Sequence, residues 1–491
     1  PGSTHSTAAV SIIRATVGNA VGSVPAVRWT HPDVVKQSTF SSEAMAIVRS
    51  GGFVCNAQYF DANAFGISQS EAHVMDPQQR MLLEFGYAAL HGASQRRRAL
   101  LSCDCGVFLG IERPEWMLAQ PPSARASSYG ATGDSMSVAS GRLSFVLGLQ
   151  GPAYSIDTAC SSSLAAMHSA FFACSAHECS FVAPLTVALH LVPHGALSMA
   201  FAGMLSVDGR CKTLDTRANG YAFSDGMGAS VLQPFFGRAG FRVAQYAGSS
   251  VRQDGLSASL TAPNGSAQRM LLQVALSRVP LMASNVASME LHGTGTALGD
   301  ATEVGAVLAV YGASMRNAPL AVSASKASVG HSEAAAGQIG LLWTLSNLWD
   351  RTQAGNAQLR RLNALVDDSL SLESSSLLAS VQVGACSTNT AASACNVSSF
   401  GYSGTIVHAV LTGRMDCSCE KILGQSNIDE LDERVCWPTR LTYCRRAFLW
   451  RPASHPFAQR RLLNIGEPSS IMRSSASELL HVIVSDHIVQ G

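Results

Sequence analysis

The chain is poor in charged and aromatic residues and carries almost no net charge. Only 14% of its 491 residues are Asp, Glu, Lys or Arg, 7% are aromatic, and the formal net charge is +1. Together with 47% hydrophobic residues, this composition is typical of a large buried α/β core and excludes a disordered chain. The balanced charge, with no basic stripe interleaved with aromatic residues, excludes a nucleic-acid-binding protein.

Cysteine pairs of the zinc-binding type are absent as well. The thirteen cysteines include no Cys-x-x-Cys pair. Cys103/Cys105 and Cys417/Cys419 are spaced too closely for the usual zinc ligand pairs. We therefore expect no metal site, and we interpret most of the thiols as free structural residues.

Charge is missing altogether between Glu178 and Asp208, where most residues are apolar. An apolar stretch of this length could span a bilayer. It is interrupted, however, by two prolines and two histidines: Pro184, Pro193, His190 and His194. We therefore predict a core strand, a turn and a helix, and no membrane span. The start of the chain also lacks the charged and apolar regions of a signal peptide.

The most informative cysteine is Cys160. An apolar segment over 152–159 leads into it and predicts a strand, and small hydroxyl residues follow it. The next residues recur at the spacing of one helix face: Leu164, Met167, His168 and Phe171. A cysteine at a strand-to-helix turn lies at the positive end of the helix dipole, so we expect a favoured thiolate. The N–H groups of the turn would hold the oxyanion of a thioester under attack. Taken alone, the residue also fits a buried structural cysteine.

Two histidine motifs of similar construction lie downstream. His292 stands in the run Glu290–Asp300, and His331 stands in the run Lys326–Gly337. Glycine and small residues adjoin each histidine, so the backbone can approach a ligand closely. One thiol and two neutral imidazoles suit a reaction that needs a nucleophile and hydrogen-bond donors for a developing enolate. Each histidine by itself also fits a satisfied core residue.

A fourth segment, residues 396–405, is a glycine-spaced loop with Phe400 and Tyr402, which alone also fits an ordinary tight turn. In this order, the four segments resemble the β-ketoacyl synthase (ketosynthase) domain of modular polyketide synthases and fatty acid synthases. Other stretches resemble landmarks of that family: 24–29, 75–80, 148–152, 208–213, 253–255 and 260–265. The resemblance runs from about Val24 to His408, most of the chain.

The resemblance implies a thiolase-like α/β fold, in which two similar βαβαβαββ-type halves form a five-layer α-β-α-β-α sandwich. It also implies a mechanism. Cys160 takes an acyl chain from the phosphopantetheine arm of an acyl carrier protein. His292 and His331 stabilise the enolate left when malonyl-carrier protein loses carbon dioxide. That carbanion then attacks the thioester and gives a β-ketoacyl product.

The resemblance gives supporting roles to four further residues. Tyr402 and Phe400 belong to the gating loop, and the N–H groups of Cys160 and Tyr402 form the oxyanion hole. Lys326 orders the surroundings of the histidine, and Glu333 follows the histidine as in the family. No bound cofactor or metal is implied, and the expected partners are an acyl carrier protein, neighbouring synthase domains and a second copy in a homodimer. A reactive thiolate needs a reducing compartment, so we expect the cytoplasm.

Several residues have simpler structural explanations. Asp300 and Glu303 have the spacing of a capping box with Asp300 at the N-cap, and we favour that role over acid/base catalysis. Gly337 and Gly340 are explained by close helix packing. Phe171 and Phe172 are expected in the core.

Three positions depart from the family pattern. Ile406 replaces an asparagine and is expected to shift the gating loop, and Asp225 replaces a glutamate. The stretch 183–186 carries a proline where the family is glycine-rich. Since proline cannot donate to a sheet ladder, local strand pairing is in question there.

We expect three regions along the chain. Residues 1–412 form the ketosynthase, with an N-terminal strand that is missing or divergent; 413–454 form a linker; and 455–491 are the truncated start of a dehydratase-like domain, indicated by the stretch Asp486–Gly491. A C-terminal tail explains that last stretch equally well.

Three rival functions remain. A non-elongating domain that passes acyl chains usually lacks the histidine that is present here as His292. A catalytically silent scaffold is suggested by the unusual start of the chain. A thiolase would need a second catalytic cysteine, for which Cys395 is the nearest candidate, although the surrounding motif does not fit.

Overall fold

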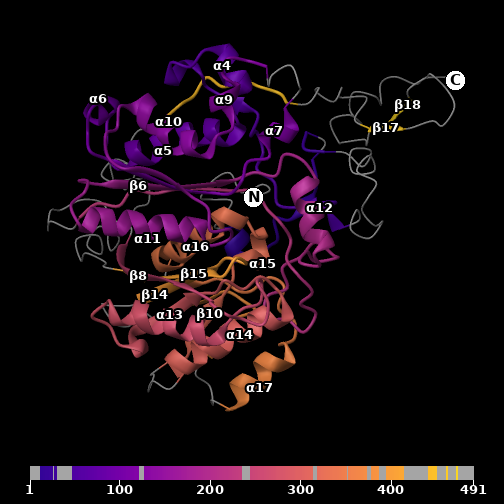
Figure 1. Cartoon of the computed structure of the whole chain (residues 1–491). Coiled ribbons are helices and arrows are strands. Elements are labelled where there is room, and N and C mark those ends of the chain that lie inside the picture. The colour runs from indigo at the N-terminus through magenta and orange to yellow at the C-terminus, as the bar shows by residue number, and fades with distance from the viewer. Residues whose placement is uncertain are drawn as a thin grey trace, which may run out of the picture.

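Two β-sheets and three helical layers make up the body of the molecule (Figure 1). The structure is a computed structural model. It describes residues 12–25, 27–29, 47–120, 126–234, 244–312, 318–350, 352–372, 377–385, 394–413, 441–450, 460–462 and 471–473. In Figure 1 helices lie above the upper sheet, between the sheets and below the lower sheet, which confirms the five-layer α-β-α-β-α sandwich.

The N-terminal sheet has the strand order β5-β4-β6-β7. Its strands are β4 (Gly106–Ile111), β5 (Ala153–Ile156), β6 (Val182–Ala188) and β7 (Gly226–Ala229). The pairs β4–β5 and β4–β6 are parallel, and β6–β7 is antiparallel. Every residue of β4 and β6 is buried. Continuous apolar strands of this kind are expected where a parallel sheet has helices on both faces.

The concern about strand pairing around Pro184 is not borne out. Pro184 lies inside β6, in register with Phe108 of β4. Its carbonyl oxygen accepts hydrogen bonds from the N–H of Ser230 at 3.1 Å and from the side chain of Gln338 at 3.2 Å. The missing N–H therefore removes a donor without breaking the pairing of β6 on either side.

The C-terminal sheet has the order β12-β10-β9-β14-β15-β8. Its strands are β8 (Gln245–Gln253), β9 (Val286–Glu290), β10 (Leu320–Ser323), β12 (Leu377–Ala379), β14 (Ala394–Phe400) and β15 (Thr405–Thr412). The strands from β12 to β14 are parallel, and β15 and β8 continue the sheet antiparallel.

The two sheets repeat one pattern. In each, a central strand (β4 or β9) has a parallel partner on both sides, and an antiparallel strand (β7 or β15) follows on one edge. β12 and β8 extend the second sheet at its two ends and have no counterparts among the described residues of the first sheet. The two similar halves are thus confirmed. The expected missing or divergent N-terminal strand stays a prediction, because residues 1–11 lie outside the described ranges.

The middle layer consists of α11 (Ser162–Ser175) and α16 (Ala336–Asp350), which pack against each other between the sheets. A Cβ at Gly337 would lie 2.6 Å from Cγ of Leu164, and one at Gly340 would lie 3.1 Å from Cγ of Glu290. These glycines therefore permit close packing, as predicted. α5 (Pro77–Gly92) and α10 (Met136–Leu147) cover the outside of one sheet, and α13 (Gly265–Ser277) and α14 (Ala297–Val307) cover the other (Figure 1).

Shorter elements connect these layers. The helices among them are α4 (Gln69–Val74), α6 (Arg97–Leu100), α7 (Trp116–Ala119), α9 (Gly130–Gly133), α12 (His194–Phe201), α15 (Lys326–Val329) and α17 (Ala364–Leu372). The uncharged stretch forms β6, a turn and α12, as predicted. Within the described ranges, no helix is both long and apolar enough to cross a membrane.

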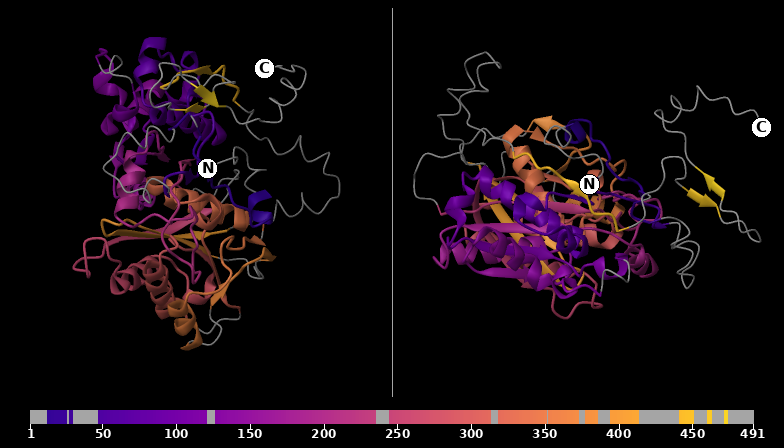
Figure 2. Two further views of the ribbon diagram at one scale, coloured as in Figure 1. Left: turned by 90° about the vertical axis from the view of Figure 1, so that its right-hand side faces the viewer. Right: turned by 90° about the horizontal axis from the view of Figure 1, so that it is seen from above.

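The segment 441–450 returns to the N-terminal half. Its strand β16 (Arg446–Ala447) pairs with β3 (Tyr59–Phe60), and Phe448 and Trp450 are buried. Part of the predicted linker therefore packs on the domain. The strand pair β17 (Arg460–Leu462) and β18 (Ile471–Arg473) lies apart from the layers in Figure 2. The predicted dehydratase signature at Asp486–Gly491 lies outside the described residues.

Candidate active site

Cys160 occupies a tight turn between β5 and α11. The preceding Ala159 has φ 54°, in the left-handed region that β-carbon-bearing residues rarely adopt. The turn also packs closely against the end of β4, because a Cβ at Gly110 would lie only 2.6 Å from the backbone N of Ser163. The predicted strand-to-helix turn is thus confirmed, with α11 beginning at Ser162.

Three residues of the fourth segment, residues 396–405, contact Cys160 or His292. Ser399 donates through Oγ to the carbonyl oxygen of Cys160 at 2.7 Å, and Phe400 donates through its N–H to Nδ1 of His292 at 3.2 Å. The N–H of Tyr402 forms a hydrogen bond with the Cys160 thiol. The end of β14 and the loop after it therefore hold the thiol and one imidazole at fixed positions.

The two histidines lie side by side and approximately perpendicular. The ring centroids of His292 and His331 are 5.5 Å apart, with an interplanar angle of 84°. His292 follows β9 and His331 follows β10, so parallel neighbouring strands deliver both to one edge of the sheet. The structure therefore brings Cys160, His292 and His331 together from three separate stretches of the chain.

Both imidazoles are neutral. Burial, followed by the nearby Lys326 ammonium, lowers the pKa of His331 to about 3 and the pKa of His292 well below its usual range. His331 is fully buried, and neither of its ring nitrogens has a hydrogen-bond partner within the described part of the chain. A buried polar group without a partner is costly, so both ring nitrogens of His331 remain available for a further hydrogen bond.

Acidic residues of α14 hold the loop around His292. Glu303 accepts from the N–H groups of His292 at 2.7 Å and Gly293 at 2.9 Å, and Asp300 accepts from the N–H of Gly295 at 3.1 Å. The predicted capping box is wrong, because α14 begins at Ala297 and both carboxylates lie inside it. Both carboxylates instead bind backbone N–H groups of the loop that precedes α14.

The expectation of a favoured Cys160 thiolate is also wrong. The thiol is 7% exposed, and its burial raises its pKa well above the usual range. The carboxyl groups of Glu112 and Glu333 raise it further, whereas Lys326 and the N–H of Tyr402 lower it. Burial and the two acidic groups outweigh the helix terminus on which the prediction depended.

The remaining predicted residues line the same region. Lys326 begins α15 and is 4% exposed. Phe400 is 8% exposed and its ring lies 5.4 Å from that of His292, while Tyr402 is 44% exposed. Ile406 pairs with Phe400 as a buried residue of β15, and the expected shift of the gating loop stays a prediction.

A buried charge network behind the histidines was not predicted. Arg28 donates to Asp225 at 2.6 Å, and Asp225 lies 3.2 Å from Nδ1 of His190. Nε2 of His190 lies 3.2 Å from Glu333. Although burial opposes it, the charges of Glu333 and Asp225 raise the pKa of His190 well above its usual range. Asp225, a departure from the family, thus has an ionic role.

Two sequence signals point to the overlooked residues. His190 follows β6 inside the uncharged stretch, and Glu112 follows the wholly apolar β4. Polar residues directly after buried parallel strands lie where sites form in α/β sheets. One core prediction also failed, because Phe172 is 42% exposed.

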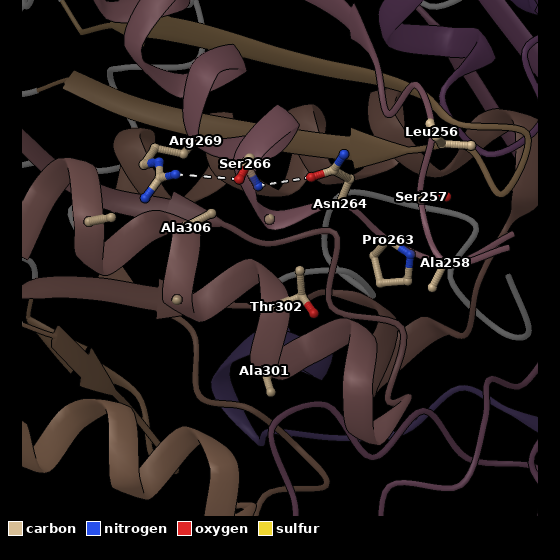
Figure 3. A pocket seen from close by; sticks show the side chains of 13 residues that line it. Leu256, Ser257, Ala258, Pro263, Asn264, Ser266, Arg269, Ala301, Thr302 and Ala306 are labelled. Atoms are coloured by element: carbon tan, nitrogen blue, oxygen red, sulfur yellow. Dashed lines mark hydrogen bonds between the residues drawn. The ribbon is translucent and has the colours of Figure 1, made fainter. Parts of the chain in front are cut away.

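A separate surface pocket of about 510 Å³ lies between the starts of α13 and α14 (Figure 3). Arg269 donates to Ser266, whose N–H donates to Asn264, along one rim, and Thr302 extends from α14. None of Cys160, His292 and His331 lines this pocket. In the part of the chain that the structure describes, no group of three His, Cys, Asp or Glu side chains is placed to hold a metal ion.

Comparisons with known proteins place the chain in a family. The model of the β-ketoacyl synthase N-terminal domain matches residues 8–235, and that of the C-terminal domain matches residues 243–360. Erythronolide synthase of Saccharopolyspora erythraea is 40% identical over 319 residues, which are 64% of this chain and 9% of that protein. Mycoketide-CoA synthase of Mycobacterium tuberculosis is 39% identical over 369 residues, 74% of this chain and 9% of that protein. The chain thus spans a small part of these relatives.

Solved structures agree with this assignment. The ketosynthase from module 6 of the bacillaene synthase of Bacillus subtilis 168 has a TM-score of 0.74 and 31% identity, covering 83% of this chain and 70% of that chain. The oxazolomycin ketosynthase domain of Streptomyces albus JA3453 has a TM-score of 0.75 and 27% identity, covering 83% and 73%. Motifs, fold and comparisons agree, and the chain belongs to the β-ketoacyl synthase family.

Proposed function

We propose that the chain catalyses a decarboxylative Claisen condensation within polyketide or fatty acid biosynthesis. The observation that carries the proposal is the convergence of one thiol and two neutral imidazoles, Cys160, His292 and His331, on strand ends of a ketosynthase fold. In the first step the Cys160 sulfur attacks the acyl thioester on a carrier protein. The thiol proton ends on the departing pantetheine sulfur, and the acyl group ends on Cys160.

In the second step malonyl-carrier protein loses carbon dioxide. Because Nδ1 of His292 accepts from Phe400, the ring proton is on Nε2 and is free to donate to the thioester oxygen of the enolate. His331 is the second donor, since its ring nitrogens lack partners among the described residues. Fixed donors aimed at a developing negative charge in a dry site supply large stabilisation.

In the third step the carbanion attacks the carbonyl carbon of the Cys160 thioester. The N–H groups of Cys160 and Tyr402 would hold the resulting oxyanion, which requires the Tyr402 N–H to turn from sulfur to oxygen. Collapse expels the Cys160 thiolate and yields a β-ketoacyl-carrier protein. The mechanism needs no cofactor other than the pantetheine arm, and it needs the reduced thiol of a compartment such as the cytoplasm.

The presence of His292, held on both its backbone and its ring, favours elongation over the passing of acyl chains or a silent scaffold. The partners we propose are an acyl carrier protein, neighbouring synthase domains and a second copy of the chain. The second copy would dock at β5, an edge strand of its sheet, where Tyr154 is 53% exposed. An exposed strand edge is a ready template for another strand.

Intact-protein mass spectrometry after exposure to an acyl thioester tests the proposal. We expect an acyl adduct on the wild type and none on Cys160→Ala, followed by transfer of the adduct when malonyl-carrier protein is added. Acylation without condensation would establish an acyl-passing domain. No adduct on a folded protein would establish a silent scaffold and refute the proposed chemistry.

A further inference from the structure

The carboxyl groups of Glu112 and Glu333 form a hydrogen bond with each other beside Cys160. Glu112 follows β4 directly, whereas Glu333 begins the short turn after His331. Glu333 has φ 45°, an unfavourable backbone conformation that the surrounding fold imposes. An ionised carboxylate can only accept hydrogen bonds, so two carboxyl groups can bond only when one of them keeps its proton.

The neighbouring charged groups decide which of the two carboxyl groups keeps the proton. Nε2 of His190 lies 3.2 Å from Oε2 of Glu333, and His190 is held on its other nitrogen by Asp225. Although burial opposes it, the charge of His190 lowers the pKa of Glu333. Burial, followed by the charge of Glu333, raises the pKa of Glu112 well above its usual range. Glu333 is therefore the charged member and Glu112 carries the proton.

The pair lies close to the nucleophile for a topological reason. The last register pairs of the equivalent strands are Gly110↔Ile156 and Glu290↔Ser323. Glu112 stands two residues beyond the first pair, as His292 stands two residues beyond the second. Glu112 thus occupies, in the N-terminal half, the position that His292 occupies in the C-terminal half. The close approach of Gly110 to α11 brings this strand end to the cysteine turn.

Other titratable groups face this cluster from every adjacent element. Asp157 acts on Glu112 from the cysteine turn, and Glu115 lies close enough to Glu333 and His190 to interact with both. Lys326, Tyr221 and Tyr402 interact with the thiol, and His331 interacts with Glu333. In this setting a second charge on the carboxyl pair would lie next to a forming thiolate, where like charges repel.

We propose that Glu112 is a positioning residue for the condensation, which keeps a proton next to Cys160 so that the carboxyl pair carries one negative charge rather than two during acyl transfer. This inference rests on the proposed function, because it assigns a task to the wall of the same site. When Glu112 loses its proton at alkaline pH, the added charge suppresses the reactive thiolate. Glu112 forms no bond to the acyl group.

The test is the rate at which iodoacetamide alkylates Cys160 as a function of pH, followed by peptide mass spectrometry so that other thiols are distinguished. Glu112→Gln keeps a hydrogen-bond donor for Glu333 but can never become charged. We expect it to match the wild type near pH 7 and to react faster at alkaline pH, with the alkylation midpoint lowered by about one pH unit, equivalent to about tenfold in rate. Glu178→Gln, at an exposed position after α11, is the matched control and should match the wild type throughout.

Identical profiles for Glu112→Gln and the wild type would overturn the inference. An equal acceleration at neutral and alkaline pH would also overturn it, because Glu112 would then be charged at pH 7. If Glu112→Gln does not fold, Glu333→Gln serves as the second variant. It also leaves one ionisable carboxyl group and should show the same faster alkaline reaction. Alkylation of Cys160 needs no carrier protein. A failure of condensation would therefore refute the proposed function without changing the outcome of the alkylation test.

Discussion

The backbone N–H of Phe400 donates a 3.2 Å hydrogen bond to Nδ1 of His292. A backbone amide can only donate, so Nδ1 is unprotonated and the neutral ring carries its proton on Nε2. Glu303 fixes the same residue from the other side by accepting from its N–H at 2.7 Å. The tautomer and orientation of His292 are thus set before any substrate arrives.

Replacement of His292 should separate the two halves of the reaction. We expect His292→Ala to lower the rate of malonyl-carrier protein decarboxylation by about 10²–10³-fold, the usual cost of losing one oxyanion donor. Acylation of Cys160 should change only slightly, because that step does not use the donor. Mass spectrometry of the carrier protein and of the enzyme follows both steps.

His194→Ala is the control, since His194 is an exposed residue at the start of α12. Equal losses of acylation and decarboxylation in His292→Ala would contradict the separate role of this donor.

The buried charge network around His190 should make the folded protein less stable as the pH becomes alkaline. The pKa of His190 is raised well above its unfolded value near 6.5. Its contribution is therefore complete below pH 6.5 and is lost as pH rises through the folded pKa. We expect His190→Gln to have a lower melting temperature than the wild type at pH 6, with the difference shrinking towards pH 10. A difference in melting temperature between His190→Gln and the wild type that stays the same at all pH values would contradict the charged state of His190.

Close packing at the cysteine turn should make Gly110 intolerant of a side chain. A Cβ there would lie 2.6 Å from backbone atoms of Ser163. We expect Gly110→Ala to reduce the free energy of unfolding by about 1–3 kcal/mol and to slow acylation, because overpacking moves the turn. Chemical denaturation and the acylation assay measure these effects.

Gly141 is a matched control inside α10, where no atom lies within 4 Å of the added Cβ. Gly141→Ala should be neutral or stabilising by about 0.4–1 kcal/mol. Similar effects at both glycines would show that crowding at the cysteine turn is not the cause.

The proposed dimer depends on the exposed edge of β5. Tyr154→Lys places a charge on that edge, and we expect a shift from dimer to monomer in analytical ultracentrifugation, with at least tenfold weaker association. Phe201→Lys is the control, since Phe201 is 75% exposed on α12, which is not part of that edge. A dimer unchanged by Tyr154→Lys would place the interface elsewhere.

Several local features could be predicted because they depend on neighbours in sequence. The apolar run before Cys160 and the helical spacing after it predicted β5 and α11. The prolines and histidines of the uncharged stretch correctly excluded a membrane helix in favour of β6 and α12. These signals are local, since periodicity and chain-breaking residues act within one element.

The failed predictions each depended on a distant partner. The spacing of Asp300 and Glu303 fits a capping box, yet both bind backbone N–H groups of the preceding loop and the neighbouring strand connection. The Cys160 thiolate was expected from its own turn, whereas Glu112 and Glu333 approach it from other strands. No local pattern reports such charges.

The linear order of residues determined the chemical groups, the family and the strand-to-helix turns that carry them. Folding alone decided the protonation state of those groups, because burial and charges brought from remote strands set the energy of each ionised form. His292 and His331 are neutral, His190 is charged and the Cys160 thiol keeps its proton for that reason.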